Sequence, residues 1–168
     1  MAKCQAVLLL VAALCVLSLA GFAQAKNSHY KVQGTVYCDT CRIQFITRIS
    51  TMMEGATVKL ECRNITTQAS TFKAEAVTDK LGMYSIPVDG DFEDDICEIQ
   101  LLKSPDSECS EISHDVYAKQ SAKVSLTANN GEATDTRSAN ALGFMRKERL
   151  PQCPEVLKEL DLFDLPAN

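Results

Sequence analysis

Cysteine is the residue type that most constrains the fold of this chain, which has eight cysteines in 168 residues. Two of them, Cys38 and Cys41, form a C-x-x-C pair directly after an alternating apolar segment. Such a pair can be a redox site, half of a metal site or an anchor for disulfides. The choice depends on the compartment in which the chain folds, so the N-terminus is interpreted first.

The first 25 residues have the three parts of a secretory signal peptide. Lys3 gives a positive start, residues 7–20 are apolar, and residues 23–25 (Ala-Gln-Ala) fit the small-x-small cleavage pattern. The apolar run of 14 residues is shorter than the roughly 20 that a membrane-spanning helix needs. We therefore expect removal of residues 1–25, a single domain over residues 26–168, and secretion into the extracellular space.

Removal of this leader changes the composition that matters for folding. The mature chain has 143 residues, enough for one domain with a hydrophobic core. Cys4 and Cys15 leave with the leader, so six cysteines remain, and the net charge becomes −6. Because binding to phosphate groups needs a basic face, we expect neither nucleic acid nor a membrane as a partner.

Most of the mature chain alternates apolar and polar residues in short segments separated by turns, which predicts strands. Gly34 within the first of them predicts a bulge or a close backbone approach, and residues 43–50 are interpreted as a strand or an extended loop. Residues 78–82 are predicted to join the third and fourth strands as a hairpin. The predicted strands are residues 31–37, 57–62, 71–78, 83–88 and 97–102, with further short ones within 115–126 and 141–145.

The C-terminus has a different pattern. Val156, Leu160 and Phe163 lie at helical spacing, and Pro154 suits the first position of a helix. We expect one short helix here, tied to the domain by Cys153. The sequence thus predicts an all-β fold, a disulfide-bonded β-sandwich or barrel of immunoglobulin- or transthyretin-like type, with one short C-terminal helix.

An even set of cysteines in a small secreted domain predicts a disulfide framework, although six cysteines allow 15 pairings and spacing alone does not choose among them. A thiol-disulfide enzyme would need a thiolate stabilised at a helix N-terminus. Here the residues after Cys41 include β-branched ones that do not favour a helix, and the negative charge of Asp39 disfavours a thiolate. A zinc site would need a second closely spaced Cys or His pair, and the other cysteines stand alone. We expect no metal and no cofactor.

Six segments of the chain together resemble the olive-pollen major allergen family (Ole e I, the pollen allergen and extensin domain), and are closest in appearance to its chenopod pollen allergens. They are residues 32–42 (Val-Gln-Gly-Thr-Val-Tyr-Cys-Asp-Thr-Cys-Arg), 54–62, 82–85, 95–99 and 141–144, and Cys153. The resemblance implies a secreted, glycosylated protein of pollen, associated with pollen-tube growth and allergic sensitisation. It also implies the disulfides Cys38–Cys109, Cys41–Cys153 and Cys62–Cys97.

One N-glycosylation sequon occurs in the sequence, Asn64-Ile65-Thr66. In a secreted protein we expect a glycan on Asn64. The resembled family often carries its glycan on a later loop, and in this chain the corresponding residues 130–132 lack the required hydroxyl. The glycan position of the family therefore does not transfer.

Other candidate sites fit solvated surface better than chemistry. Residues 89–95 are acidic, but an EF-hand would need Gly and Glu where this sequence has Asp94 and Gln100. His29 lies near the mature N-terminus, and His114 has no G-x-S-x-G nucleophile motif beside it. We expect no catalytic residue.

The sequence therefore predicts a non-enzymatic, secreted pollen protein that is an allergen bound by IgE. We expect an interaction or structural role in the pollen-tube wall or in pollen-tube growth, with an unknown extracellular protein or wall component as the partner. Two alternatives stay open. One is a module for a small ligand or a wall polysaccharide, although Trp, the commonest platform for sugar stacking, is absent. The other is a secreted thiol-disulfide enzyme that uses Cys38 and Cys41.

Overall fold

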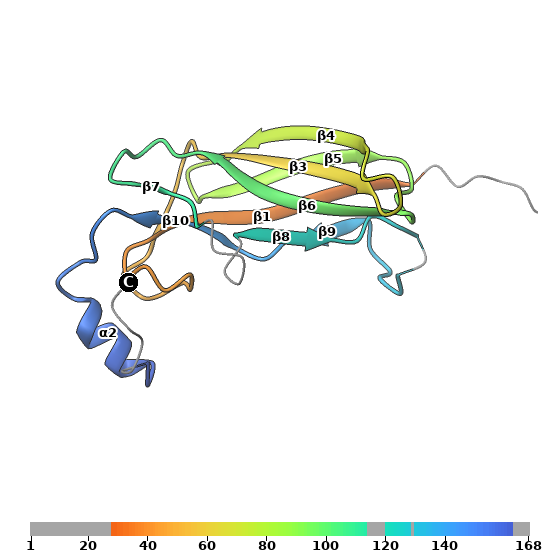
Figure 1. The fold of residues 1–168 in the computed structure, drawn as a ribbon. Coiled ribbons are helices and arrows are strands. Elements are labelled where there is room, and N and C mark those ends of the chain that lie inside the picture. The colour runs from red at the N-terminus through yellow and green to blue at the C-terminus, as the bar shows by residue number, and fades with distance from the viewer. Residues whose placement is uncertain (1–27, 114–119, 129, 163–168) are drawn as a thin grey trace, which may run out of the picture.

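The computed structural model describes residues 28–113, 120–128 and 130–162 (Figure 1). The predicted leader, His114 and Phe163 lie outside the described residues. Within them, ten strands precede one short helix. The elements are β1 (His29–Asp39), β2 (Thr51–Met52), β3 (Thr57–Asn64), β4 (Ser70–Val77), β5 (Met83–Asp89), β6 (Asp95–Lys103), β7 (Cys109–Glu111), β8 (Ser121–Val124), β9 (Thr136–Ser138), β10 (Leu142–Arg146) and α2 (Cys153–Glu159).

The strands form two sheets that pack face to face around one hydrophobic core. The predicted all-β fold with a short C-terminal helix is confirmed, and it is a sandwich rather than a closed barrel. The smaller sheet has the order β4-β3-β6-β8, with every pair antiparallel. Its inward residues alternate along β3 and β6 as predicted, with Val58, Leu60, Ile99 and Leu101 buried.

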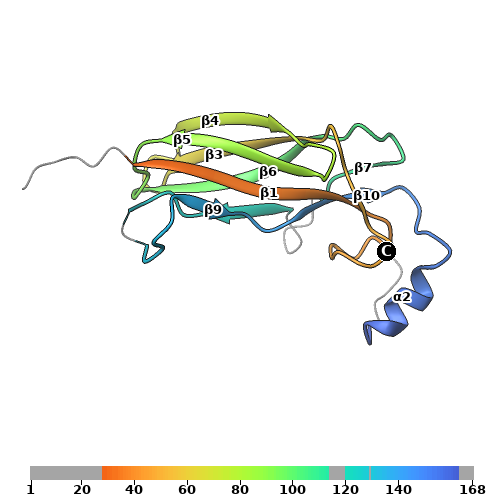
Figure 2. The same ribbon diagram turned by 180° about the vertical axis from the view of Figure 1, so that it is seen from behind.

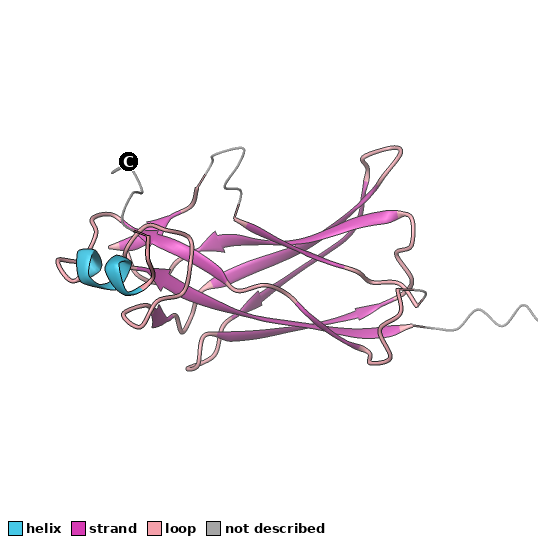
Figure 3. Ribbon diagram, turned by 90° about the horizontal axis from the view of Figure 1, so that it is seen from below, coloured by secondary structure: helices cyan, strands magenta, loops and turns pink. Residues whose placement is uncertain are grey.

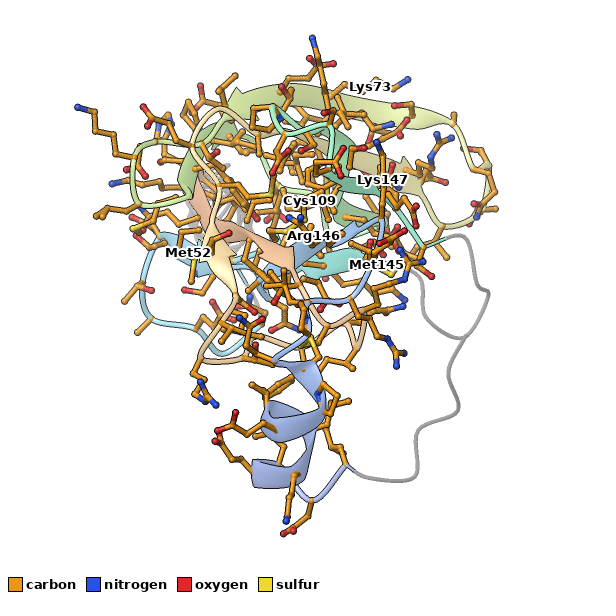
Figure 4. The ribbon with its side chains drawn as sticks, turned by 90° about the vertical axis from the view of Figure 1, so that its left-hand side faces the viewer. Met52, Lys73, Cys109, Met145, Arg146 and Lys147 are labelled. Atoms are coloured by element: carbon orange, nitrogen blue, oxygen red, sulfur yellow. A yellow bond between two sulfur atoms is a disulfide. The ribbon has the colours of Figure 1, made fainter. Side chains whose placement is uncertain are left out.

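The larger sheet is built around the long strand β1. The first half of β1 pairs antiparallel with β5 and parallel with β9, and these two strands flank it in Figure 2. The second half pairs antiparallel with β2 and parallel with β10, which continues to β7. Figure 4 accordingly shows Met52 of β2 and Met145 of β10 on opposite sides of β1. The C-x-x-C pair thus lies at the end of β1 that pairs with β2 and β10. Cys38 is in the strand, and Cys41 follows it.

The predicted hairpin between residues 71–78 and 83–88 is wrong. Strand β4 pairs with β3, and β5 pairs with β1, so residues 78–82 carry the chain from one sheet to the other. At the start of this connection the buried hydroxyl of Thr78 accepts a hydrogen bond of 2.9 Å from the backbone N–H of Ala56. Gly82 then passes so close to Val36 that a Cβ atom on it would lie 2.6 Å from the Val36 carbonyl oxygen.

Two tyrosine rings lie over glycines on the neighbouring strand. Tyr84 of β5 is directly opposite Gly34 of β1, and Tyr37 of β1 is directly opposite Gly143 of β10. A Cβ atom on Gly34 would overlap the Tyr84 hydroxyl, and one on Gly143 would lie 2.6 Å from the Tyr37 ring. The close approach predicted at Gly34 is therefore present and is made by an aromatic ring, an arrangement that fixes strand register.

Helix α2 lies at one end of the sandwich (Figure 3) and projects away from it (Figure 4). Pro154 occupies its first turn and Val156 is buried, as the helical spacing predicts, whereas Leu160 is largely exposed. In the described part of the chain, no helix is long and apolar enough to cross a membrane. A helix of seven residues is too short to be stable alone, so its position depends on the contacts described below.

Candidate functional site

The two cysteines of the C-x-x-C pair are not joined to each other. Each is buried, and each ties the end of β1 to a distant part of the chain, one to β7 and the other to α2. The third disulfide links residues that are directly opposite in the β3–β6 pair. The three disulfides join Cys38 to Cys109, Cys41 to Cys153 and Cys62 to Cys97, which are the pairs that the family resemblance implies.

Asp39 lies between the two cysteines, and its side chain is fully buried, with an exposed fraction of 0%. Its carboxylate accepts hydrogen bonds from the backbone N–H groups of Cys41 at 3.2 Å and Gln44 at 2.5 Å. Burial raises the pKa of Asp39, and the surrounding backbone N–H groups offset only part of that rise. The sequence interpretation treated Asp39 only as a negative charge near the thiols and missed that the chain folds around it.

Residues 42–50, which we call the anchored loop, follow from this arrangement. The prediction left a strand or an extended loop open, and the structure shows a loop. Asp39 captures N–H groups that a strand would use in its ladder, and Arg42 and Gln44 take left-handed conformations with φ of 56° and 57°. Thr47 is buried, and its backbone N–H donates to the Ser50 hydroxyl at 2.9 Å, which closes the far end of the loop.

Two arginines fasten the anchored loop to its surroundings. Arg42 donates to the backbone carbonyl of Arg146 at 2.6 Å and pairs with Glu111 at 2.5 Å. Arg48 makes a bidentate ion pair with Glu159 of α2, with N–O distances of 2.8 and 3.0 Å. The loop is thus held by a disulfide at Cys41 and by ion pairs on both sides.

The anchored loop exposes apolar side chains beside a pocket. Phe45 is 59% exposed and Ile46 is 37% exposed, which is unusual for large apolar residues in a loop that is otherwise so well fixed. The pocket has a volume of about 520 Å³ and lies between the loop, strands β1 and β10 of the larger sheet, and the start of β8 in the smaller sheet. Its walls include Gln44, Phe45 and Ile46 from the loop and Tyr37, Leu142 and Gly143 from β1 and β10.

A second group of charged residues lies on the outer face of the smaller sheet. Glu61 of β3 has only 3% of its surface exposed, because the side chains of Lys59, Arg63 and Lys73 cover it at N–O distances of 2.8, 2.7 and 3.2 Å. Hydrogen bonds from Lys59 and then from Lys73 and Arg63 outweigh desolvation and lower the pKa of Glu61 to about 2. We call these four residues the Glu61 cluster. The alternation of Lys59, Glu61 and Arg63 was the signal that could have revealed it.

The predicted glycosylation site lies at a turn, where its sequon was expected. Asn64 ends β3, and its side-chain oxygen accepts hydrogen bonds from the backbone N–H groups of Thr66 at 3.1 Å and Thr67 at 3.0 Å. Its amide nitrogen is 3.4 Å from the carbonyl oxygen of Asp94. Asn64 is half-buried, and Thr66 is exposed. Glycosylation of Asn64 stays a prediction.

The remaining candidate residues are dispersed. His29 pairs with Asp89 at 2.5 Å, and both side chains are mostly exposed to solvent. Among the described residues, no three His, Cys, Asp or Glu side chains gather in a way that could hold a metal ion. Within the acidic segment 89–95, residues 91–95 line a shallow surface pocket of about 440 Å³ together with Asn64.

Comparison with known proteins identifies the family. The profile of the family described as "Pollen protein Ole e 1 like" matches residues 28–161. The chain is 82% identical to pollen allergen Che a 1 of Chenopodium album and 80% identical to pollen allergen Cro s 1 of Crocus sativus, in each case over the full length of both chains. The crystal structure of the major plantain pollen allergen Pla l 1 matches with a TM-score of 0.68 and 35% identity, over 74% of this chain and 99% of that one. This chain therefore belongs to the Ole e 1-like pollen protein family.

Proposed function

We propose that this chain is a secreted, non-enzymatic pollen protein that acts by binding an extracellular protein or a component of the pollen-tube wall. The observation that carries the proposal is the state of the C-x-x-C pair. Cys38 and Cys41 are each buried in a separate disulfide, so the anchored loop between β1 and β2 is held rigid instead of presenting a reactive thiol. A rigid loop with exposed Phe45 and Ile46 is suited to recognition, because little entropy is lost when it binds.

The alternative of a thiol-disulfide enzyme is weaker on geometry. Exchange requires an attacking thiolate that can reach its substrate and a resolving cysteine nearby. Cys41 has no exposed surface and Cys38 has 4%. Reduction of insulin by the purified protein, lost in a Cys38→Ser variant, would support the enzyme and contradict the proposal. We expect no reduction above background.

We also propose that the chain is an allergen bound by IgE, since its relatives at 82% and 80% identity are named pollen allergens. Three disulfides hold distant segments together, which favours epitopes that depend on the fold. Reduction and alkylation should then abolish most binding of IgE from sensitised sera. Unchanged binding after that treatment would show that the epitopes are linear.

Retention on isolated pollen-tube walls tests the binding function directly. The protein is expressed in plant cells, and sequencing of its mature N-terminus checks that residues 1–25 are removed. The fraction of the protein that is retained on the walls is then measured. Phe45→Ser should reduce retention at least severalfold. Ile65→Ser is the matched control, because Ile65 is 54% exposed and the substitution keeps the sequon. Ile65 belongs to the connection between β3 and β4, which lies at the end of the sandwich away from α2 in Figure 1. Equal retention of the Phe45→Ser variant and the wild type, or no retention of the wild type, would contradict the proposal.

A further inference from the structure

We propose that the pocket beside the anchored loop binds a neutral hexose unit, as a free oligosaccharide or as part of a wall polysaccharide. This inference rests on the proposed function and names the chemistry of its partner. The pocket volume of about 520 Å³ is within the range of roughly 300–1,000 Å³ typical of small-ligand sites. The argument depends on which side chains line it.

The lining combines apolar and polar side chains but carries no charge. In a mature chain with 22 acidic residues, none of the residues that line this pocket is acidic or basic. Three residues with side-chain amides line it from three separate segments, Gln44, Gln120 and Asn140, together with Ser121. Amides and hydroxyls both donate and accept hydrogen bonds, as the hydroxyl groups of a sugar require.

Most of these groups have no hydrogen-bond partner in the described part of the chain. Within the described part of the chain, the side-chain amides of Gln44 and Asn140 and the hydroxyl of Tyr37 make no hydrogen bond to protein. Gln120 accepts one hydrogen bond, of 3.2 Å, from the backbone N–H of Ser113. A ligand that offers several hydroxyls can therefore be bound without breaking a hydrogen bond among the described residues, apart from that one.

Tyr37 forms a rigid part of the wall. Its ring lies over Gly143, where no side chain would fit, and only 2% of the residue surface is exposed. Burial, and to a smaller extent the charge of Asp39, raises the pKa of Tyr37 to about 12. The hydroxyl therefore keeps its proton at physiological pH and can both donate and accept a hydrogen bond.

The apolar part of the pocket suits the C–H face of a sugar ring. Phe45 and Ile46 of the anchored loop line it, as do Leu142 at the start of β10 and Ala141 just before it. Two aromatic residues line the pocket, and because Tyr37 is buried, the exposed Phe45 is the one available for stacking. An anionic uronate would meet no cation in this lining, and a purely apolar ligand would leave the amides without partners, so the lining favours a neutral sugar.

Titration followed by amide NMR shifts tests the proposal. The probes are neutral hexose disaccharides and tetrasaccharides, with an oligogalacturonide as the anionic comparison. We expect saturable shifts at residues 44–46 and 140–143 with the neutral probes only. Tyr37→Phe removes the hydroxyl and keeps the ring on Gly143, and it should weaken binding by roughly threefold to tenfold, the effect of one hydrogen bond. Asn140→Ala should weaken binding by a similar factor.

Tyr84→Phe is the matched control, because Tyr84 is also a buried tyrosine over a glycine but does not line this pocket. It should leave binding unchanged. The inference is overturned if the neutral probes cause no shifts in the pocket, if the oligogalacturonide binds as well, or if Tyr37→Phe and Tyr84→Phe behave alike. Retention on pollen-tube walls that neutral sugars do not compete for would overturn the inference and leave the proposed function standing. Absence of wall retention by the wild type would overturn the proposed function, whereas saturable shifts with the neutral probes would still support the inference.

The same titration separates the two sources of the sugar. If a short oligosaccharide saturates the pocket and releases the protein from walls, the natural ligand is the free end of a polysaccharide chain or a soluble sugar. Binding that is seen with neutral wall polysaccharide and requires a tetrasaccharide or longer points to a polymer that crosses the pocket. Both results support the inference.

Discussion

Two buried carboxylates in different parts of the molecule behave in opposite ways. Asp39, in the turn between the C-x-x-C cysteines, receives only neutral backbone N–H groups, and burial raises its pKa. Glu61, on the outer face of the smaller sheet, is covered by Lys59, Arg63 and Lys73, and its pKa falls to about 2. Backbone N–H donors thus offset only part of the pKa rise that desolvation causes in a carboxylate. Nearby cations lower the pKa by more than desolvation raises it.

The same two regions use their disulfides differently. Cys62 and Cys97 join strands that are already hydrogen-bonded to each other, so their bridge reinforces a regular sheet. Cys41 and Cys153 join the end of β1 to α2, for which no strand pairing exists, so their bridge and the Arg48–Glu159 ion pair fix the position of the helix. The position of α2 at the irregular end of the molecule thus depends on a few individual bonds. The regular sheet is held by many strand hydrogen bonds as well as by its disulfide.

The largest expected effect is on removal of the bridge to α2. The Cys41→Ala, Cys153→Ala double variant should lose about 5 kcal/mol of unfolding free energy, since the bridge closes 112 residues. The Cys62→Ala, Cys97→Ala variant, with a closure of 35 residues, should lose about 4 kcal/mol. Hydrogen exchange should quicken in α2 in the first variant only, because β3 and β6 remain paired in the second. Unchanged protection of α2 without its bridge would break the comparison.

A smaller effect is expected at Asp39. Asp39→Ala leaves the N–H groups of Cys41 and Gln44 without an acceptor, which should cost about 2–3 kcal/mol in urea unfolding. Asp39→Asn keeps one acceptor oxygen and removes the buried charge, so it should be closer to the wild type. Equal stability of Asp39→Ala and the wild type would mean that the loop does not depend on this carboxylate.

The pH dependence separates the two carboxylates. Because the pKa of Glu61 is lowered in the folded state, its contribution is present at neutral pH and is lost as the pH falls from about 5 towards about 2. Glu61→Gln should lower the free energy of unfolding by about 1 kcal/mol at pH 7, because solvent screens the surrounding cations and limits the effect. The variant should also lose less stability than the wild type on the acid side of the profile. A profile that keeps its slope in Glu61→Gln would contradict the assignment.

Asp39 should act in the opposite sense. Its pKa is raised in the folded state, so its ionisation costs stability as the pH rises through that pKa, and protonation relieves the cost. The Asp39→Asn variant should therefore gain relative to the wild type between acid and neutral pH. Parallel stability profiles of Asp39→Asn and the wild type would show that the buried charge has no cost.

The smallest effect on stability is expected at the exposed end of the anchored loop. Phe45→Ser should change the unfolding free energy by no more than about 0.5 kcal/mol, since Phe45 is 59% exposed. Calorimetry of this variant beside Ile65→Ser provides the comparison. A large loss of stability would show that Phe45 serves the fold, and its effect on wall retention could then not be assigned to recognition.

The regular sheet was largely readable from the sequence, because alternation fixes which residues of β3 and β6 face the core. The outward alternation of Lys59, Glu61 and Arg63 also indicates three of the four residues of the Glu61 cluster. Lys73 could not be included, because it meets Glu61 only through the β3–β4 register. The hairpin error has the same origin: the turn at 78–82 was visible, but local turn chemistry does not determine which strands pair.

The irregular end was much less predictable. The pocket combines Tyr37 with Gly143, which are brought together by a parallel pair of strands more than a hundred residues apart in sequence. The role of Asp39 depends on how the following residues wrap around it, and no periodic pattern encodes that. The cysteine pairs were available only through the family resemblance, since spacing left 15 possibilities open.

The central claim is that the C-x-x-C cysteines are structural anchors and leave no reactive thiol. Peptide mapping of the purified protein under non-reducing conditions tests it most directly. The account predicts linked peptides for Cys38 with Cys109, Cys41 with Cys153 and Cys62 with Cys97, and no free thiol at these six positions. A peptide with Cys38 bridged to Cys41, or free thiols at both, would contradict it.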